Sequence, residues 1–361
     1  GRAPLASAAI KALTQAAGYA IVEVDPVTGQ RDQREDAVSA LLQDLTGAGG
    51  ALVVNNNAAA TTLMLAALTA DTEVVISRGE LVEIGGGFRI PDVMRRAGCT
   101  MVEVGATNKT HVYDFENASN EQTSAYLKVH PSNYRIEGFA GTPSVAELSA
   151  LAKERGLMVL DDLGSGLLWN EPLPGLVDEP RVADSLEQGA DVTCFSGDKL
   201  LGGPQTGILV GDAAMIARCR AHPLYRAMRC DKLVLAALEA TLLLYRDGNP
   251  LAAVPALRML SVSQEDLENR AGVLAALLRE LDAEVVRSES FAGSGANPAK
   301  PLQSFATALP GGDAHCDRLR NARPVSVFAR VSEGRVLLDA RTLLLEDLDV
   351  VALAVRQALC D

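Results

Sequence analysis

The stretch that decides the fold is "CFSGDKLLGGPQTGILVG", residues 194–211. Two short apolar runs, 192–196 and 207–211, flank a turn that holds Lys199 and a glycine pair. Short continuous apolar runs of this kind are typical of strands that are buried on both faces of a sheet. A lysine directly after such a strand lies at the edge where open α/β sheets bind ligands. The alternative for Lys199 is an ordinary place in a solvated loop.

The same pattern recurs along the chain before this stretch. Further apolar runs occupy residues 51–54, 73–77, 100–104, 125–129 and 157–162. Helical patterns separate several of them, for example at 144–156, where Ser144 and Glu147 have the spacing of a capping box. We therefore expect an α/β fold with a mostly parallel sheet that is covered by helices on both faces.

The pattern changes after a long helix expected at 231–245 and the Gly/Pro break that follows it. The elements expected there are a helix after Ser263, strands at 284–288 and 303–309 around a loop at 291–301, a helix near 313–320, a hairpin across 325–341 with a Ser-Glu-Gly turn, and a last helix from about 345. The sequence thus predicts a large domain at 1–245, which includes an N-terminal helical region at 1–35, and a small α+β domain at 246–361.

Composition narrows the class of protein. Of the 361 residues, 48% are apolar and only 4% are aromatic, as in α/β enzymes. No apolar run reaches the ~18 residues of a membrane span, and the first residues do not resemble a secretory signal, so we expect a cytoplasmic protein. Six scattered cysteines and four dispersed histidines indicate free thiols and no metal site. A net charge of −13 is unfavourable for binding nucleic acid.

The stretch "VVNNNAAATTLML" (53–65) predicts a strand that leads into a helix. Asn56, Asn57 and Ala58 lie at the junction, where asparagine can cap the helix. The free N–H groups at a helix start bind phosphate well. An N-capped helix with no ligand is the alternative, and the stretch does not have the GxGxxG pattern of a dinucleotide site.

A third motif, "LMVLDDLGSG" (157–166), ends a strand in two carboxylates. Either Asp161 or Asp162 could bind a metal, cap the turn, or pair with a protonated ring nitrogen. A phosphate site, then Asp162, then Lys199 is the chain order that pyridoxal phosphate requires. The phosphate anchors the cofactor, the carboxylate keeps the pyridine nitrogen protonated, and the lysine forms a Schiff base.

Several long motifs together resemble the bacterial selenocysteine synthase family. They are "NNNAAA", "SRGELVEIGGGFRIPDVMRRAGC" (77–99), "VEVGATNKTH" (102–111), "LKVHPSNYRIEGF" (127–139), "DLGSG" and "SGDKLLGGPQ". The resemblance covers nearly the whole chain and implies a fold-type-I pyridoxal-phosphate transferase with a sheet of the seven-stranded type. It also implies conversion of L-seryl-tRNA(Sec) to L-selenocysteinyl-tRNA(Sec), by loss of water and addition of selenium from selenophosphate.

The resemblance assigns roles to individual residues. Lys199 would hold the cofactor and act as the base at Cα. Arg226 and Arg229 would bind selenophosphate together with Arg2, since guanidinium groups suit a phosphate-bearing donor. These two arginines are three residues apart and would share a face if they lie in a helix. The alternative is that they are solvated or bind the tRNA backbone.

Other positions complete the predicted site. His130 could stack on the cofactor ring or be an ordinary histidine at the edge of the core, and Ser196 would contact the cofactor. Asp198 would be structural or tune the lysine. The roles of Arg89 and Arg341 stay open, although Arg341 lies where fold-type-I relatives bind a substrate carboxylate. Cys194 and Cys230 are expected to be buried.

The resemblance also implies partners and a missing part. Family members form homodecamers and carry an N-terminal tRNA-binding domain, which we expect to be absent from this chain; its homo-oligomer would be a decamer or smaller. Two other functions fit the sequence. One is a pyridoxal-phosphate lyase for a small phosphorylated amino compound, such as an amino-sugar phosphate, and the other is a non-catalytic assembly or RNA-binding module.

Overall fold

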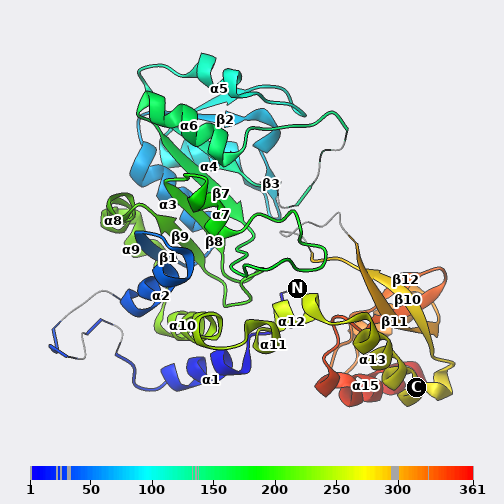
Figure 1. Ribbon diagram of the computed structural model, residues 1–361. Helices are drawn as coiled ribbons and strands as arrows, with labels where there is room; N and C mark the ends of the chain where they lie inside the picture. Colours follow the sequence, from blue (N-terminus) through cyan, green and yellow to red (C-terminus); the bar gives the residue numbers. More distant parts are fainter. Residues whose placement is uncertain are drawn as a thin grey trace. The chain divides into compact units, whose positions relative to one another are not determined.

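Figure 1 shows the computed structural model, which describes residues 2–21, 23–24, 27–30, 34–131, 133–134, 136, 138–293, 301–323 and 325–360. The chain forms two compact units, the first from residues 2–172 and 178–257 and the second from 173–177, 258–293 and 301–360. The domain boundary proposed from the sequence, at 245/246, lies within the first unit by this division. Most of the expected loop at 291–301 lies outside the described residues.

The first unit is built on a seven-stranded sheet in the order β1-β9-β8-β7-β6-β2-β5. Its strands are β1 Gly50–Val54, β2 Glu73–Ser77, β5 Thr100–Val104, β6 Thr123–Val129, β7 Met158–Gly164, β8 Val192–Ser196 and β9 Gly207–Gly211. Only β9 runs antiparallel to its two neighbours, and all other pairs are parallel. The predicted mostly parallel sheet is therefore confirmed.

Helices lie on both faces of this sheet (Figure 1). The helices of the first unit are α1 Ser7–Ala16, α2 Asp36–Thr46, α3 Asn57–Thr69, α4 Ile90–Ala97, α5 Val112–Ala118, α6 Val145–Arg155, α7 Val182–Glu187, α8 Ala213–Ala221, α9 Pro223–Met228, α10 Lys232–Asp247 and α11 Pro250–Ala253; α12 Pro255–Ser261 spans the division between the units. On one face α3, α4 and α8 pack against the strands, and on the other α2, α10, α5 and α6 do so. The expected cap of α6 is confirmed, because Ser144 and Glu147 hydrogen-bond each other's backbone N–H.

The alternation of side chains along each strand explains the two layers. In β1, Leu52 packs into the core under α3, whereas Val53 packs into the core under α2 and α10. Since successive side chains point to opposite faces, an all-apolar strand supplies both cores at once. The same alternation sends Asp161 and Asp162, near the end of β7, to opposite faces of the sheet.

The second unit holds a four-stranded antiparallel sheet in the order β10-β11-β13-β12. Its elements are α13 Gln264–Leu277, β10 Glu284–Ser290, β11 Leu302–Pro310, α14 Asp313–Arg320, β12 Arg330–Ser332, β13 Arg335–Asp339 and α15 Leu348–Cys360, with short 3-10 helices at Arg279–Leu281 and Leu345–Asp347. The predicted α+β pattern is confirmed, but the paired part of the hairpin is shorter than 325–341. Its turn uses Glu333 and Gly334, both with positive φ.

The sequence analysis did not predict a second, two-stranded sheet in the first unit. It consists of β3 Glu83–Ile84 and β4 Phe88–Arg89, which are joined by a turn at residues 85–87. Among the described helices, none is long and apolar enough to cross a membrane.

Candidate active site at the carboxyl ends of the strands

The start of α3 forms the first wall of the site. Asn56 caps the helix, since its side-chain oxygen accepts the Ala59 N–H at 2.9 Å. The backbone N–H groups of Asn57 and Ala58 have no acceptor among the described residues, as expected for the first turn of a helix. Gly207 of β9 allows this approach, because a Cβ there would lie 2.0 Å from the carbonyl oxygen of Asn56. The helix start thus presents donors suited to an anion.

Asp162 lies directly beneath this helix start. Its side chain is buried, with the residue only 4% exposed. The side-chain amide of Asn57 donates to one carboxylate oxygen and the Thr61 hydroxyl to the other, each at 2.8 Å. Burial raises the pKa of Asp162 above its ordinary value, and the two hydrogen bonds and the charge of Lys199 oppose this shift. The carboxylate is therefore held in place but lacks a strong cationic partner.

Asp161 belongs to a different environment, on the opposite face of β7. It accepts a hydrogen bond from the Ser185 hydroxyl at 2.5 Å, and Ser185 in turn contacts Thr193 at 2.7 Å. Burial raises the pKa of Asp161 to about 6. The structure thus separates the two carboxylates that the sequence left as alternatives, and only Asp162 faces α3.

The elevated pKa of Asp161 predicts a pH-dependent stability. Because the folded-state pKa, about 6, lies above the ordinary 3.8, the folded state holds the extra proton between these values. The contribution of Asp161 to the free energy of unfolding is fully present below pH 4. It is lost as the pH rises through 6, which lowers the free energy of unfolding by about 3 kcal/mol. We expect Asp161→Asn to gain about that much relative to wild type between pH 4 and pH 7 in urea unfolding. A pH-independent difference between the two proteins would contradict this.

Lys199 lies in the tight turn after β8. Tyr245 of α10 donates from its hydroxyl to the carbonyl oxygen of Leu201 at 2.8 Å, which ties the turn to the helix. The ammonium group has no hydrogen-bond or ion-pair partner among the described residues. Burial lowers the pKa of Lys199 below its ordinary 10.5, while the charge of Asp162 opposes the shift. The Leu200 N–H donates to the carbonyl oxygen of Ser165 at 3.1 Å and β8 pairs with β7, so the turn that holds Lys199 lies beside the end of the strand that carries Asp162. Burial also favours a nucleophilic amine.

A chain of polar contacts runs beside the lysine. The Ser196 hydroxyl donates to one oxygen of Asp198 at 2.5 Å, and the Arg2 guanidinium donates to the other at 2.8 Å. Asp198 is nearly buried, whereas the Arg2 side chain is 49% exposed. The charge of Arg2 lowers the pKa of Lys199 further. The structure therefore brings Arg2 and Ser196 to the predicted site through Asp198.

His130 follows β6 at the same edge of the sheet. Its backbone N–H donates to the carbonyl oxygen of Asp162 at 3.0 Å, and its Nε2 lies 3.5 Å from Oε1 of Glu179. Glu179 is buried and was missed by the sequence analysis, because it lies in an irregular segment before α7 with no motif around it. The charge of Glu179 also raises the pKa of Lys199.

Arg226 and Arg229 do not lie in one helix, so the condition under which they would share a helical face is not met. The helix α9 ends at Met228, and Arg229 continues in extended conformation, with φ −67° and ψ 149°. Arg229 forms a β-bridge with Val54 at the end of β1. The Asn55 N–H donates to the carbonyl oxygen of Met228 at 2.8 Å, which holds the two segments side by side. Arg226 remains exposed on α9.

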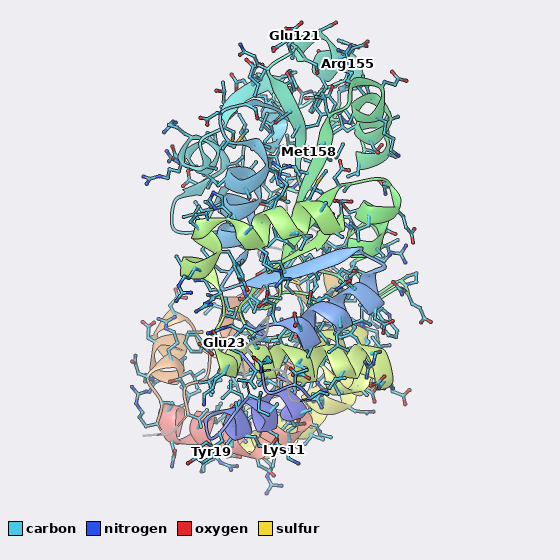
Figure 2. All side chains as sticks on the ribbon, turned by 90° about the vertical axis from the view of Figure 1, so that its left-hand side faces the viewer. Lys11, Tyr19, Glu23, Glu121, Arg155 and Met158 are labelled. Atoms are coloured by element: carbon cyan, nitrogen blue, oxygen red, sulfur yellow. The ribbon has the colours of Figure 1, made fainter. Side chains whose placement is uncertain are left out.

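The half-buried Arg229 side chain lies near a carboxylate of the N-terminal segment. Its guanidinium is 3.7 Å from Oε1 of Glu23, and the same oxygen accepts a hydrogen bond from Arg34 at 3.1 Å. Figure 2 shows Glu23 toward the end of the first unit that carries Lys11 and Tyr19. Two guanidinium groups around one carboxylate form a site that favours an anion.

Arg89 and Arg341, whose roles stayed open, both have local partners. Arg89 forms an exposed ion pair with Glu83 at 2.6 Å across the small hairpin. Arg341 is buried in the second unit and donates to the backbone carbonyl oxygens of Met259 and Gln303, at 2.8 and 2.5 Å. Because these contacts occupy its guanidinium, the geometry supports a structural role for Arg341 rather than capture of a carboxylate.

Several buried polar side-chain atoms in the first unit lack a hydrogen-bond partner among the described residues. In the described part of the first unit, every buried side-chain polar atom without a hydrogen-bond partner follows β1, β6 or β7: Asn57 Oδ1, Asn133 Oδ1, Ser165 Oγ, Trp169 Nε1 and Glu179 Oε1. Such orphaned atoms are rare in proteins and usually indicate a bound ligand or water. With the free N–H groups of α3, the buried Asp162 and the buried amine of Lys199, they fit pyridoxal phosphate.

Other ligand classes fit less well. No group of three or more His, Cys, Asp or Glu that could hold a metal ion occurs among the described residues. Cys194 and Cys230 are both buried, as expected, and burial raises the pKa of each thiol. The arrangement can therefore bind a phosphorylated, ring-containing cofactor and present an amine to its carbonyl group.

Comparisons with known proteins show which family the chain belongs to. The profile of the SelA family, described as L-seryl-tRNA selenium transferase, matches residues 1–344. Proteins named L-seryl-tRNA(Sec) selenium transferase are similar throughout. The one from Solidesulfovibrio magneticus is 48% identical, over 99% of this chain and 79% of its own length. Those from Hyphomonas neptunium and Moorella thermoacetica are 47% and 48% identical, over 99% of this chain and 79% and 78% of theirs.

Solved structures agree with the fold. A D-glucosaminate-6-phosphate ammonia-lyase has a TM-score of 0.71 at 21% identity, over 99% of this chain and 91% of its own. A serine palmitoyltransferase from S. paucimobilis, with a pyridoxal-phosphate–myriocin adduct, has a TM-score of 0.53 at 15% identity, over 98% and 83%. At these identities the likeness shows the fold, which confirms the fold-type-I architecture. With the family profile and the full-length relatives, it follows that the chain belongs to the L-seryl-tRNA(Sec) selenium transferase family.

Proposed function

We propose that this protein is a pyridoxal-phosphate enzyme that converts L-seryl-tRNA(Sec) to L-selenocysteinyl-tRNA(Sec), with selenophosphate as the selenium donor. The observation that carries the proposal is the meeting of the α3 start, Asp162 and Lys199 at one edge of the sheet, in a chain whose full-length relatives bear this name. In the overall reaction the serine hydroxyl is replaced by a selenol, and phosphate is released from the donor.

Besides Lys199, six residues would form the cofactor site. The N–H groups of Asn57 and Ala58 would bind the phosphate, with Asn56 holding the helix start in shape through its cap. Asp162, fixed by Asn57 and Thr61, would pair with the protonated ring nitrogen. His130 would lie against the ring. Ser196 would act through Asp198, to which its hydroxyl donates.

Bound pyridoxal phosphate supplies an aldehyde that condenses with amines and a ring that withdraws electrons from bonds at the substrate Cα. The chain supplies the proton transfers. Lys199 would hold the cofactor through Nζ, and the same amine, when free and neutral, would take the Cα proton, because burial disfavours its charged form. The same Nζ can deliver a proton to the departing hydroxyl, which leaves as water.

The arginines would bind the selenium donor. Arg229 lies 3.7 Å from Glu23 and Arg2 donates to Asp198, so an anionic ligand would replace or share these carboxylate contacts. Arg226 is exposed on α9. A seryl ester has no free carboxylate, so these groups are not needed for the amino-acid part of the substrate. The remaining anions are the phosphate of selenophosphate and the tRNA backbone, and we assign the half-buried Arg229 to the smaller of the two.

Replacing Arg229 should weaken the use of selenophosphate without affecting the binding of seryl-tRNA(Sec). Loss of one charge-assisted interaction costs about 1.5–3 kcal/mol, so Arg229→Ala should raise the KM for selenophosphate roughly 10–100-fold. The change in cofactor absorbance on addition of seryl-tRNA(Sec) should stay as in wild type. Arg218→Ala, an arginine on α8 that donates to backbone carbonyls of α3, is the matched control. An Arg229→Ala enzyme with unchanged KM would remove Arg229 from the donor site.

The function itself is tested through the visible absorption band of the cofactor-loaded protein. We expect the band to shift on titration with seryl-tRNA(Sec), and selenocysteinyl-tRNA(Sec) to form when selenophosphate is added. Uncharged tRNA(Sec) is the control and should leave the band unchanged. A shift only with D-glucosaminate 6-phosphate or a similar amine would instead favour the lyase function.

The cellular setting is part of the same proposal. We place the protein in the cytoplasm, because aminoacyl-tRNA is made and used there. We also propose that it forms a homo-oligomer, a decamer as the resemblance implies. Exposed large apolar side chains support association, among them Tyr19 and Phe139 in the first unit and Phe328 in the second.

A further inference from the structure

Glu179 is a buried carboxylate that the proposed reaction does not use. Its side chain is 1% exposed, and its Oε1 has no hydrogen-bond partner among the described residues. A buried charged atom without a partner is costly, so a native structure rarely retains one without a reason. Oε1 lies 3.5 Å from Nε2 of His130, which is a little longer than a hydrogen bond, so a small shift of either side chain would bring the two atoms into hydrogen-bond distance.

His130 is held at its other end by the backbone. Its N–H donates to the carbonyl oxygen of Asp162, so the residue cannot move away from the end of β7. The ring has two nitrogens and only one of them faces Glu179. An ionised carboxylate can accept a hydrogen bond and cannot donate one, so it selects the imidazole form that carries the proton on the nearer nitrogen.

We propose that Glu179 is a positioning residue, whose carboxylate accepts the Nε2–H of His130 and thereby fixes the tautomer and plane of that imidazole. Among the described residues, Lys199 is a further charged group near this pair, since the charge of Glu179 affects its pKa. Carboxylates orient histidine rings in the same way at metal sites, where losing the partner typically costs about 10–100-fold in affinity or activity.

The consequence for the cofactor rests on the proposed function. If His130 lies against the cofactor ring, a fixed imidazole plane sets the tilt of that ring relative to Asp162 and Lys199. A loosened imidazole would leave the cofactor bound but less uniformly oriented. Glu179 would thus affect the reaction through His130, without itself touching the reacting atoms.

The test reads the proton on His130 directly. The chain has four histidines, so ¹⁵N-histidine labelling gives few signals, and His130→Gln identifies the relevant pair. In wild type, with and without pyridoxal phosphate, we expect Nε2 of His130 to give a protonated-type resonance. Glu179→Ala should shift His130 toward a mixture of tautomers and reduce the visible circular dichroism of bound cofactor severalfold. Glu187→Gln, an exposed glutamate at the end of α7, is the matched control and should change neither signal.

Glu179→Gln keeps the side-chain volume and covers the case in which the alanine variant does not fold. Its amide can donate as well as accept, so it too should weaken the preference for Nε2–H. An unprotonated Nε2 in wild type, or a His130 tautomer unchanged in both variants, would overturn the proposal. Because the resonance is measured without cofactor as well, failure of pyridoxal phosphate to bind would count against the proposed function alone.

Discussion

Lys199→Ala is expected to abolish covalent attachment of pyridoxal phosphate and to lower the rate of selenocysteinyl-tRNA(Sec) formation by at least about 10³-fold. The lysine would serve as both the attachment point and the base, so its loss removes two contributions together. Its environment supports both roles. Burial depresses its pKa, and no hydrogen bond among the described residues has to be broken before the amine reacts.

Attachment is measured by reducing the loaded protein with borohydride and determining the mass of the modified peptide. Lys199→Arg keeps a positive charge near Asp162 but cannot form the covalent link, so it should lose attachment as fully as the alanine variant does. Lys153→Ala, an exposed lysine on α6, is the control. Cofactor trapped on another lysine, with activity within tenfold of wild type, would rule out Lys199 as the attachment site.

The sequence was sufficient for the parts of the fold that depend on local pattern. Continuous apolar runs such as 207–211 predicted strands buried on both faces, and Ser144 predicted the start of α6 through its cap. The order of asparagines, Asp162 and Lys199 led to the prediction that these residues share a site, because parallel strands bring their carboxyl ends to one edge. The strand and cap predictions need only residues that are close in sequence, whereas the prediction of the site also uses the topology of the sheet.

Contacts between distant segments could not be predicted in the same way. Asn57 was expected at the phosphate, yet its amide holds Asp162, 105 residues away. Arg226 and Arg229 would share a face only in a helix, but pairing with Val54 extends the backbone at Arg229. Glu179 lies in an irregular segment, and only the fold places it beside His130. Tertiary pairing decided each of these three cases.

Asp162→Asn is expected to reduce activity by on the order of 10²–10³-fold, because breaking a buried ion pair costs about 3–5 kcal/mol. The ion pair in question is the one proposed between this carboxylate and the protonated ring of the cofactor. Asparagine keeps the shape of the side chain. Its oxygen can still accept from Asn57, and the Thr61 hydroxyl can rotate to accept from its amide, so the packing should survive.

The same substitution should not destabilise the protein without cofactor. Burial raises the pKa of Asp162, which means that the ionised carboxylate is unfavourable in the folded state until a cation pairs with it. At pH 7 the cofactor-free Asp162→Asn protein should therefore unfold at the same or a higher urea concentration than wild type. A loss of activity caused by general misfolding would give the opposite result.

Asp161→Asn supplies the matched control, since it is the same chemical change one residue earlier on the same strand. Its side chain faces Ser185 on the other side of the sheet, so the affinity for pyridoxal phosphate and the activity should remain near wild type. Equal losses of activity in both variants would mean that removing either carboxylate from β7 disturbs the site. A large loss confined to Asp162→Asn, with cofactor-free stability retained, would identify the charge facing α3 as the one that pairs with the cofactor ring.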